Sequence, residues 1–148
     1  MSNADLSSQI VDQCPGCGEN HLDLFPDTWT AVTGQSPGIA SVTWDYIQCP
    51  DAVSGPLSVH FKSGATQYWF SAQVVGANRR TQSMEVSSDG GKTWKPTTRQ
   101  TYNFFEISGG TGSSTVSIRL TSHVGTQVVL NNVPIQADKV VQATANYT

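Results

Sequence analysis

Glycine-containing turn signals divide the C-terminal part of the chain into short segments in which apolar and polar residues alternate. Beyond residue 50 these signals fall at Gly64, Gly76, Asp89-Gly90-Gly91, Gly109-Gly110 and Gly125. The segments between them are candidate strands, at 57–62, 67–75, 81–88, 92–95, 102–107, 115–121, 127–131 and 133–136. Many short strands at this spacing, without helical periodicity, are typical of an antiparallel sandwich or barrel. The sequence therefore predicts an all-β domain at 50–148.

Alternation within these segments separates core side chains from surface side chains. The predicted core residues are Leu57, Val59, Phe61, Phe70, Ala72, Val74, Met84, Val86, Phe105, Ile107, Val116, Ile118 and Leu120. The opposite parity places Trp69, Tyr102 and Phe104 on the outside. Tryptophan is usually buried, so an outward Trp69 suggests a binding function.

Composition excludes several classes of function. Charged residues make up 13% of the chain, and the polar surface is supplied instead by 17 Ser, 16 Thr and 11 Gln. The net charge of −3, with only eight Lys and Arg, argues against binding to nucleic acid or to an anionic membrane surface. Neither phosphate-binding glycine pattern is present, so we expect no nucleotide cofactor. We expect no other cofactor either.

The compartment is inferred from the N-terminus and the cysteines. Residues 1–10 contain neither the basic nor the apolar region of a signal peptide, although the composition suits a secreted protein. Three cysteines, Cys14, Cys17 and Cys49, cannot all pair within one molecule. Residues 146–148 form an N-glycosylation sequon, a weak signal by itself. We therefore expect an extracellular protein whose chain is part of a longer one.

The first fifty residues are too few to bury a core of their own. They predict a short strand at 9–12, a tight turn at 14–18, a helix at 23–33 and a strand at 39–48. Pro26 suits the first turn of that helix and Gly34 its C-terminal end. Pro50, Gly55 and Pro56 mark the boundary to the all-β domain.

Two groups of residues in this first part could carry chemistry. The Cys-Pro-Gly-Cys loop at 14–17 could be a redox dithiol, could bind zinc together with Cys49 and His21, or could belong to a structural disulfide framework, which we favour. Asp12 and Asp23 could act as paired acid and base on a sugar. The alternative is that Asp23 only caps the helix that follows.

Aromatic residues of the all-β domain predict a glycan-binding strip. Tyr68, Trp69 and Tyr102 could stack on the C–H faces of sugar rings, with neighbouring hydroxyls and amides binding the ring edges. The low charge favours a neutral polysaccharide, because nucleic-acid stacking would need more Lys and Arg beside the rings. The alternative is that these aromatics are partly buried in the sandwich. Trp44 and Trp94 are expected to pack.

Two stretches of the chain resemble the expansin family, most closely its fungal, swollenin-like members. The first contains VDQCPGC and NHLDL, at 11–17 and 20–24. The second contains YWFSAQV, MEV, DGGKTW and YNFF, at 68–74, 84–86, 89–94 and 102–105. The resemblance implies that 1–49 is the C-terminal remnant of a double-psi β-barrel domain. It further implies that 50–148 is a complete immunoglobulin-like, cellulose-binding β-sandwich.

The resemblance also implies a function and its residues. Expansins loosen cell walls without measurable hydrolysis, and two aspartates of their barrel domain correspond to Asp12 and Asp23. The aromatic platform of their second domain corresponds to Tyr68, Trp69 and Tyr102. The expected partner is cellulose or a related β-glucan, and no metal is expected. The alternatives are a lytic or hydrolytic enzyme with Asp23 as general acid, and an interaction module without a glycan ligand.

Overall fold

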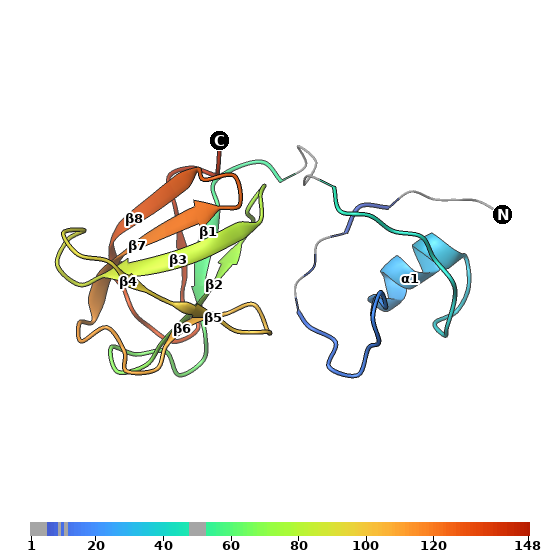
Figure 1. Cartoon of the computed structure of the whole chain (residues 1–148), viewed down its shortest axis with the longest axis horizontal. Helices are drawn as coiled ribbons and strands as arrows, with labels where there is room; N and C mark the ends of the chain where they lie inside the picture. Colours follow the sequence, from blue (N-terminus) through green and yellow to red (C-terminus); the bar gives the residue numbers. More distant parts are fainter. Residues whose placement is uncertain (1–5, 9, 11, 48–52) are drawn as a thin grey trace. The chain divides into compact units, whose positions relative to one another are not determined.

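The computed structural model describes residues 6–8, 10, 12–47 and 53–148. The chain divides into two compact units, Met1–Gln48 and Cys49–Thr148 (Figure 1). The first unit contains the helix α1 (Pro26–Thr33), and the second contains all the strands of the described residues. No helix in the described ranges is both long enough and apolar enough to cross a membrane.

Helix α1 is shorter than predicted at its N-terminus. Pro26 occupies its first turn, where the missing N–H costs no hydrogen bond. Gly34 ends it with φ at 68°, and the Gly34 N–H donates to the Thr30 carbonyl at 2.8 Å. The N-cap position is Phe25, with no side-chain cap. The interpretation of Asp23 as the helix cap is therefore wrong, because two residues separate it from Pro26.

The described residues of the first unit form none of the strands predicted there. Residues 39–47 lie outside any strand, and Ile39 is fully exposed. Alternation suggested a strand here, but none of the described residues of this unit offers a partner strand, and an isolated strand is not stable in water. Ile10 and Asp12 are not in a strand either, whereas Gln9, Val11 and Gln48 lie outside the described residues. Trp44 is 40% exposed rather than packed in a sheet.

The second unit is an antiparallel β-sandwich, as predicted (Figure 1). One sheet has five strands, in the order β5 (Thr98–Arg99), β6 (Phe105–Ile107), β2 (Phe70–Val75), β1 (Ser58–Phe61) and β9 (Val140–Gln142). The other has four, in the order β4 (Lys95–Pro96), β3 (Thr81–Ser87), β7 (Thr115–Ser122) and β8 (Gln127–Pro134). All neighbouring strands run antiparallel.

Several strand boundaries differ from the prediction. The strands predicted at 67–75 and 102–107 begin only at Phe70 and Phe105. The segments 127–131 and 133–136 are one strand, β8, with an irregularity opposite Ser117 where Asn132 has φ at 54°. The expected strand at 92–95 is displaced to β4. Strands β5 and β9 were not predicted, because two or three residues are too few to show alternation.

The core lies between the two sheets and contains the residues that alternation predicted. Phe61 and Phe70 are fully buried and meet edge to face, with ring centroids 5.8 Å apart. Met84, Ile118 and Leu120 face them from the four-stranded sheet and are at most 1% exposed. Val74 and Ile107, also assigned to the core, are only partly buried.

The loop between β3 and β4 is held by one carboxylate. Asp89 accepts hydrogen bonds from the hydroxyls of Ser87 and Thr93, at 2.7 and 2.6 Å, and from the backbone N–H groups of Lys92 and Thr93. Gly90 and Gly91 have positive φ, as the tight turn requires. The hydrogen bonds from Thr93 and Ser87 lower the pKa of Asp89 well below its usual 3.8. The sequence signal for a hairpin here is confirmed.

The C-terminal segment is tied to the sandwich by Asn146. Its Nδ2 donates to the carbonyls of Gly55 and Gly76, at 2.9 and 2.8 Å. Its Oδ1 accepts from the N–H groups of Asn78 and Tyr147, both at 3.0 Å. The sequon asparagine is therefore a structural residue whose amide nitrogen is already engaged.

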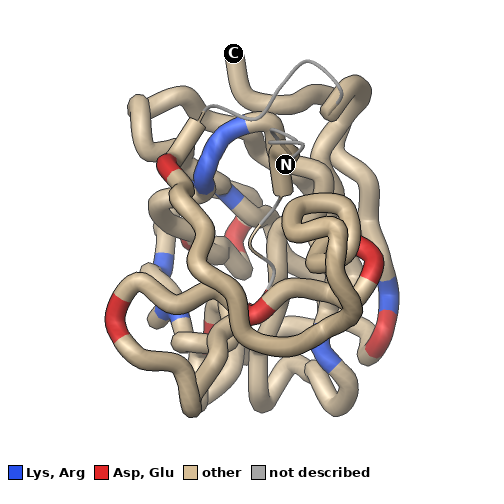
Figure 2. The backbone as a smooth tube through the Cα atoms, turned by 90° about the vertical axis from the view of Figure 1, so that its right-hand side faces the viewer, with Lys and Arg blue, Asp and Glu red and all other residues tan. Residues whose placement is uncertain are grey.

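Charge is divided unequally between the two units. All eight Lys and Arg lie between residues 62 and 139, whereas six of the 11 Asp and Glu precede residue 49. Figure 2 marks the charged positions that lie in the described part of the chain. The sandwich therefore carries a net positive charge, although the chain as a whole is acidic.

Candidate functional site

The outer face of the five-stranded sheet carries a cluster of aromatic and polar side chains. Tyr102 lies in the turn between β5 and β6, and Phe104 directly precedes β6. Their ring centroids are 6.1 Å apart. Phe105, the next residue, is 2% exposed and points into the core, so Phe104 points the other way. We call Tyr102, Phe104 and the neighbouring His60, Lys62 and Glu106 the outer-face cluster.

The Glu106 carboxylate fixes the Tyr102 ring. Its Oε1 accepts the Tyr102 hydroxyl at 3.0 Å and the Ser71 hydroxyl at 2.9 Å. Ser71 is fully buried although its parity is outward, because Glu106 of the neighbouring strand β6 covers it. Desolvation first, and then the hydrogen bond to Glu106, raises the pKa of Tyr102 above its usual value.

Lys62 brings a cation to the same rings. Its Nζ lies 4.4 Å from the Tyr102 ring centroid and 4.6 Å from that of Phe104. Lys62 directly follows β1. Its backbone N–H donates to the Ser71 carbonyl of β2, so the main chain of Lys62 is held against the neighbouring strand. The arrangement combines apolar ring surface with a hydrogen-bond donor.

A tight turn before β2 presents Tyr68 and Trp69. Thr66 and Trp69 exchange two backbone hydrogen bonds, at 2.9 and 3.2 Å. The N–H groups of Thr111 and Gly112 both donate to the Gln67 carbonyl, and these hydrogen bonds connect the turn to the loop that follows β6. Tyr68 is 74% exposed.

The neighbouring Gly110 packs directly on this turn. Its φ is 68°, and a Cβ atom there would collide with the Gln67 carbonyl and the Tyr68 backbone. Only glycine therefore allows the two loops to approach each other this closely.

The structure places the three predicted platform residues as follows. Tyr68 precedes β2, so the inward parity it would have inside a strand does not apply. Trp69 also precedes β2; it is partly buried, and a backbone bridge joins it to Thr66. Ser71, the second residue of β2, contacts Glu106, which in turn contacts Tyr102. These contacts connect the start of β2 with the turn that carries Tyr102.

Sequence reasoning did not include His60, Lys62, Phe104 and Glu106 in the site. Phe104 and Glu106 have the outward parity of Tyr102, and that signal could have identified them. His60 and Lys62 have outward parity on β1, but only the pairing of β1 with β2 brings them near the Tyr102 turn.

Asp12 and Asp23 belong to the first unit, and both are exposed. Asp12 accepts a hydrogen bond from the N–H of Gln13 at 2.8 Å. Between them, Cys14 and Cys17 form a disulfide. That bond consumes two of the four ligands that a zinc site would need. No helix follows the pair directly, so the setting of a redox dithiol is also missing. Cys49 lies outside the described residues.

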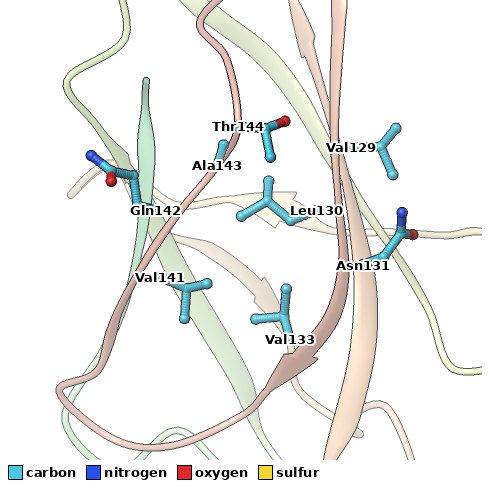
Figure 3. A pocket seen from close by; sticks show the side chains of 8 residues that line it. All are labelled: Val129, Leu130, Asn131, Val133, Val141, Gln142, Ala143 and Thr144. Atoms are coloured by element: carbon cyan, nitrogen blue, oxygen red, sulfur yellow. The ribbon is translucent and has the colours of Figure 1, made fainter. Parts of the chain in front are cut away.

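A shallow groove lies between the edge strands β8 and β9 (Figure 3). Its volume is about 320 Å³, and it is lined by Val129, Leu130, Asn131, Val133, Val141, Gln142, Ala143 and Thr144. These side chains are apolar or neutral, and none of them is aromatic. Within the described ranges, no group of three or more His, Cys, Asp or Glu is placed to hold a metal ion.

Comparison with known proteins gives two curated relatives from Dictyostelium discoideum, while no family model matches. Expansin-like protein 5 is 31% identical over 120 residues, which is 78% of this chain and 50% of the relative. Expansin-like protein 3 is 23% identical over 151 residues, covering 99% of this chain and 44% of the relative. The chain thus spans about half the length of these relatives.

Two solved structures of Clavibacter michiganensis expansin share the fold. The ligand-free protein superposes with a TM-score of 0.70 at 20% identity, over 95% of this chain and 67% of that one. A point mutant in complex with cellohexaose gives a TM-score of 0.60 at 21% identity, over 69% of this chain and 48% of that one. At these low sequence identities, the similarity shows a shared fold only.

Proposed function

The chain belongs to the expansin family, and we propose that its sandwich unit binds cellulose or a related β-glucan through Tyr68, Trp69 and Tyr102. The observation that carries the proposal is the accessible aromatic surface of this unit: Tyr68 is 74% exposed, and Glu106 holds the Tyr102 ring in the outer-face cluster. The cellohexaose complex of the Clavibacter expansin supports it, because that protein has the same fold and binds a glucan oligomer.

The chemistry of this face suits a neutral polysaccharide. The C–H faces of pyranose rings stack on aromatic rings, and Glu106 holds the Tyr102 ring in place before a ligand arrives, which lowers the entropy lost on binding. The Lys62 ammonium is available to donate hydrogen bonds to sugar hydroxyls.

The wider role is proposed from the family. The first unit would correspond to the C-terminal remnant, at 1–49, of an expansin barrel domain, followed by the sandwich at 50–148. The intact protein would act outside the cell and loosen a glucan wall without hydrolysis, with Asp12 and Asp23 as the barrel's functional carboxylates. In this proposal, binding belongs to the second unit and loosening needs both.

The test is depletion of the full chain from solution by insoluble cellulose. The variants are Trp69→Ala and Tyr68→Ala, and the matched control is Tyr46→Ala, which removes a ring that is 76% exposed in the first unit. An aromatic stacking contact contributes about 1 kcal/mol, so each site variant should bind roughly fivefold more weakly, whereas the control should bind like the unmodified chain.

Thermal unfolding separates loss of binding from loss of fold, since Trp69 is partly buried. Equal depletion of the unmodified chain and of both folded site variants would contradict the proposal, as would no depletion of the unmodified chain.

A further inference from the structure

The row of rings on the outer face continues beyond Tyr102. Phe104 lies 6.1 Å from Tyr102 and 6.4 Å from His60, measured between ring centroids. His60 is in the middle of β1, where it pairs with Gln73 of β2 on one side and with Val140 of β9 on the other. The rings of Tyr102, Phe104 and His60 therefore cross the sheet from the β5–β6 turn towards the β9 edge.

These three rings do not lie in one plane. Tyr102 and Phe104 are inclined at 48° to each other, and Phe104 and His60 at 57°. A flat crystalline surface can lie parallel to only one of these ring planes. A single glucan chain can rotate at each glycosidic bond, so successive sugars can follow the change of plane.

We propose that Phe104, assisted by His60, forms an additional sugar subsite that favours single glucan chains over crystalline cellulose. Phe104 supplies the stacking face. The Lys62 ammonium lies over the same ring, 4.6 Å from its centroid, and can donate a hydrogen bond to a sugar hydroxyl there. Gln73, which is opposite His60 in the sheet, is a further polar residue of this region. The inference rests on the proposed function. It assigns a preference for single glucan chains to the part of the outer face around Phe104 and His60.

The surroundings of Phe104 are consistent with a binding ring rather than a core ring. Its neighbour Phe105 fills the core at 2% exposure, whereas Phe104 is only partly buried. The turn that leads into it is fixed by Gln100, whose N–H donates to the Phe104 carbonyl at 2.7 Å. The backbone position therefore does not depend on the Phe104 side chain.

The test compares two ligands on the full chain. Calorimetric titration measures affinity for cellohexaose, a soluble single chain, and depletion measures retention on crystalline cellulose. Phe104→Leu keeps apolar volume but removes the flat ring, and Phe104→Tyr keeps the ring. By the size of aromatic stacking contacts, Phe104→Leu should weaken cellohexaose binding roughly fivefold and leave crystalline retention within about twofold. Phe104→Tyr should bind both ligands like the unmodified chain.

Trp69→Ala in the same assays distinguishes the two proposals. If Trp69→Ala binds both ligands weakly while Phe104→Leu binds cellohexaose like the unmodified chain, the subsite is refuted and the proposed function stands. Equal losses on both ligands in Phe104→Leu would refute the preference for single chains. If the unmodified chain binds neither ligand, the proposed function fails and the subsite fails with it. Thermal unfolding confirms that each variant is folded.

Discussion

Replacing Asn146 by alanine should destabilise the sandwich strongly for a residue near the end of the chain. The substitution removes four hydrogen bonds, two donated to the carbonyls of Gly55 and Gly76 and two accepted from the N–H groups of Asn78 and Tyr147. Each such bond contributes about 1 kcal/mol net, and water replaces part of the loss because Asn146 is only partly buried.

The expected cost of Asn146→Ala is therefore about 2–3 kcal/mol, or a fall in Tm of roughly 8–20 °C for a unit of this size. Urea unfolding followed by tryptophan fluorescence measures the free energy, and calorimetry measures Tm. A loss below about 0.5 kcal/mol, the range of a neutral surface change, would refute the reasoning.

Asn146→Asp tests the hydrogen bonds that Asn146 donates separately from those that it accepts. The aspartate keeps an oxygen towards the N–H groups of Asn78 and Tyr147, but it turns a carboxylate towards two carbonyl oxygens. That repulsion raises the folded-state pKa of the introduced carboxylate above its unfolded value. Relative to the unmodified chain, the variant should therefore be most stable at pH values below the pKa that the introduced aspartate has in the unfolded chain. It should lose stability as the pH rises through the pKa that this aspartate has in the folded chain. If the difference in stability between the variant and the unmodified chain does not change with pH, the hydrogen bonds assigned to the Asn146 amide nitrogen are contradicted.

The remaining predictions concern the core, one loop and the platform turn. Phe61→Ala should cost about 3–5 kcal/mol in urea unfolding, because a fully buried ring leaves a cavity; a cost under 1 kcal/mol would mean that Phe61 is not core. Asp89 has a lowered folded-state pKa, so its stabilisation is present above the unfolded value of 3.8 and is lost as the pH falls below it. Acid unfolding should therefore be steeper in the unmodified chain than in Asp89→Asn, and identical profiles would count against this role. Gly110→Ala should destabilise the chain by more than about 1 kcal/mol and weaken cellulose depletion, since the new Cβ displaces the Tyr68 turn; unchanged binding would show that this packing is dispensable.

Most of the sandwich could be predicted because its core strands alternate regularly. Val59 and Phe61, Met84 and Val86, and Ile118 and Leu120 are buried as alternation requires. Alternation failed at 39–47, where the pattern is present but the described residues of that unit offer no partner strand. A sequence pattern states which faces a strand would have, whereas strand formation also needs a neighbour to complete its hydrogen bonds.

The candidate site could be predicted only in part, for a related reason. Trp69 and Tyr102 carry a local signal, their outward parity in the strands predicted at 67–75 and 102–107, although the structure begins both strands after them. His60 and Lys62 approach the Tyr102 turn only through the pairing of β1, β2 and β6, which joins segments more than 30 residues apart. The contact of Glu106 with Tyr102 likewise depends on how the β5–β6 turn folds back over the sheet.

The most direct test of the binding face is a titration of the isotopically labelled full chain with cellohexaose, followed by amide chemical shifts in NMR. A glucan bound at the outer face should shift the amides of β1, β2 and β6 and of the turns that carry Tyr68 and Tyr102. Shifts confined to β7 and β8, or to the groove between β8 and β9, would place the ligand elsewhere and overturn the proposed binding face.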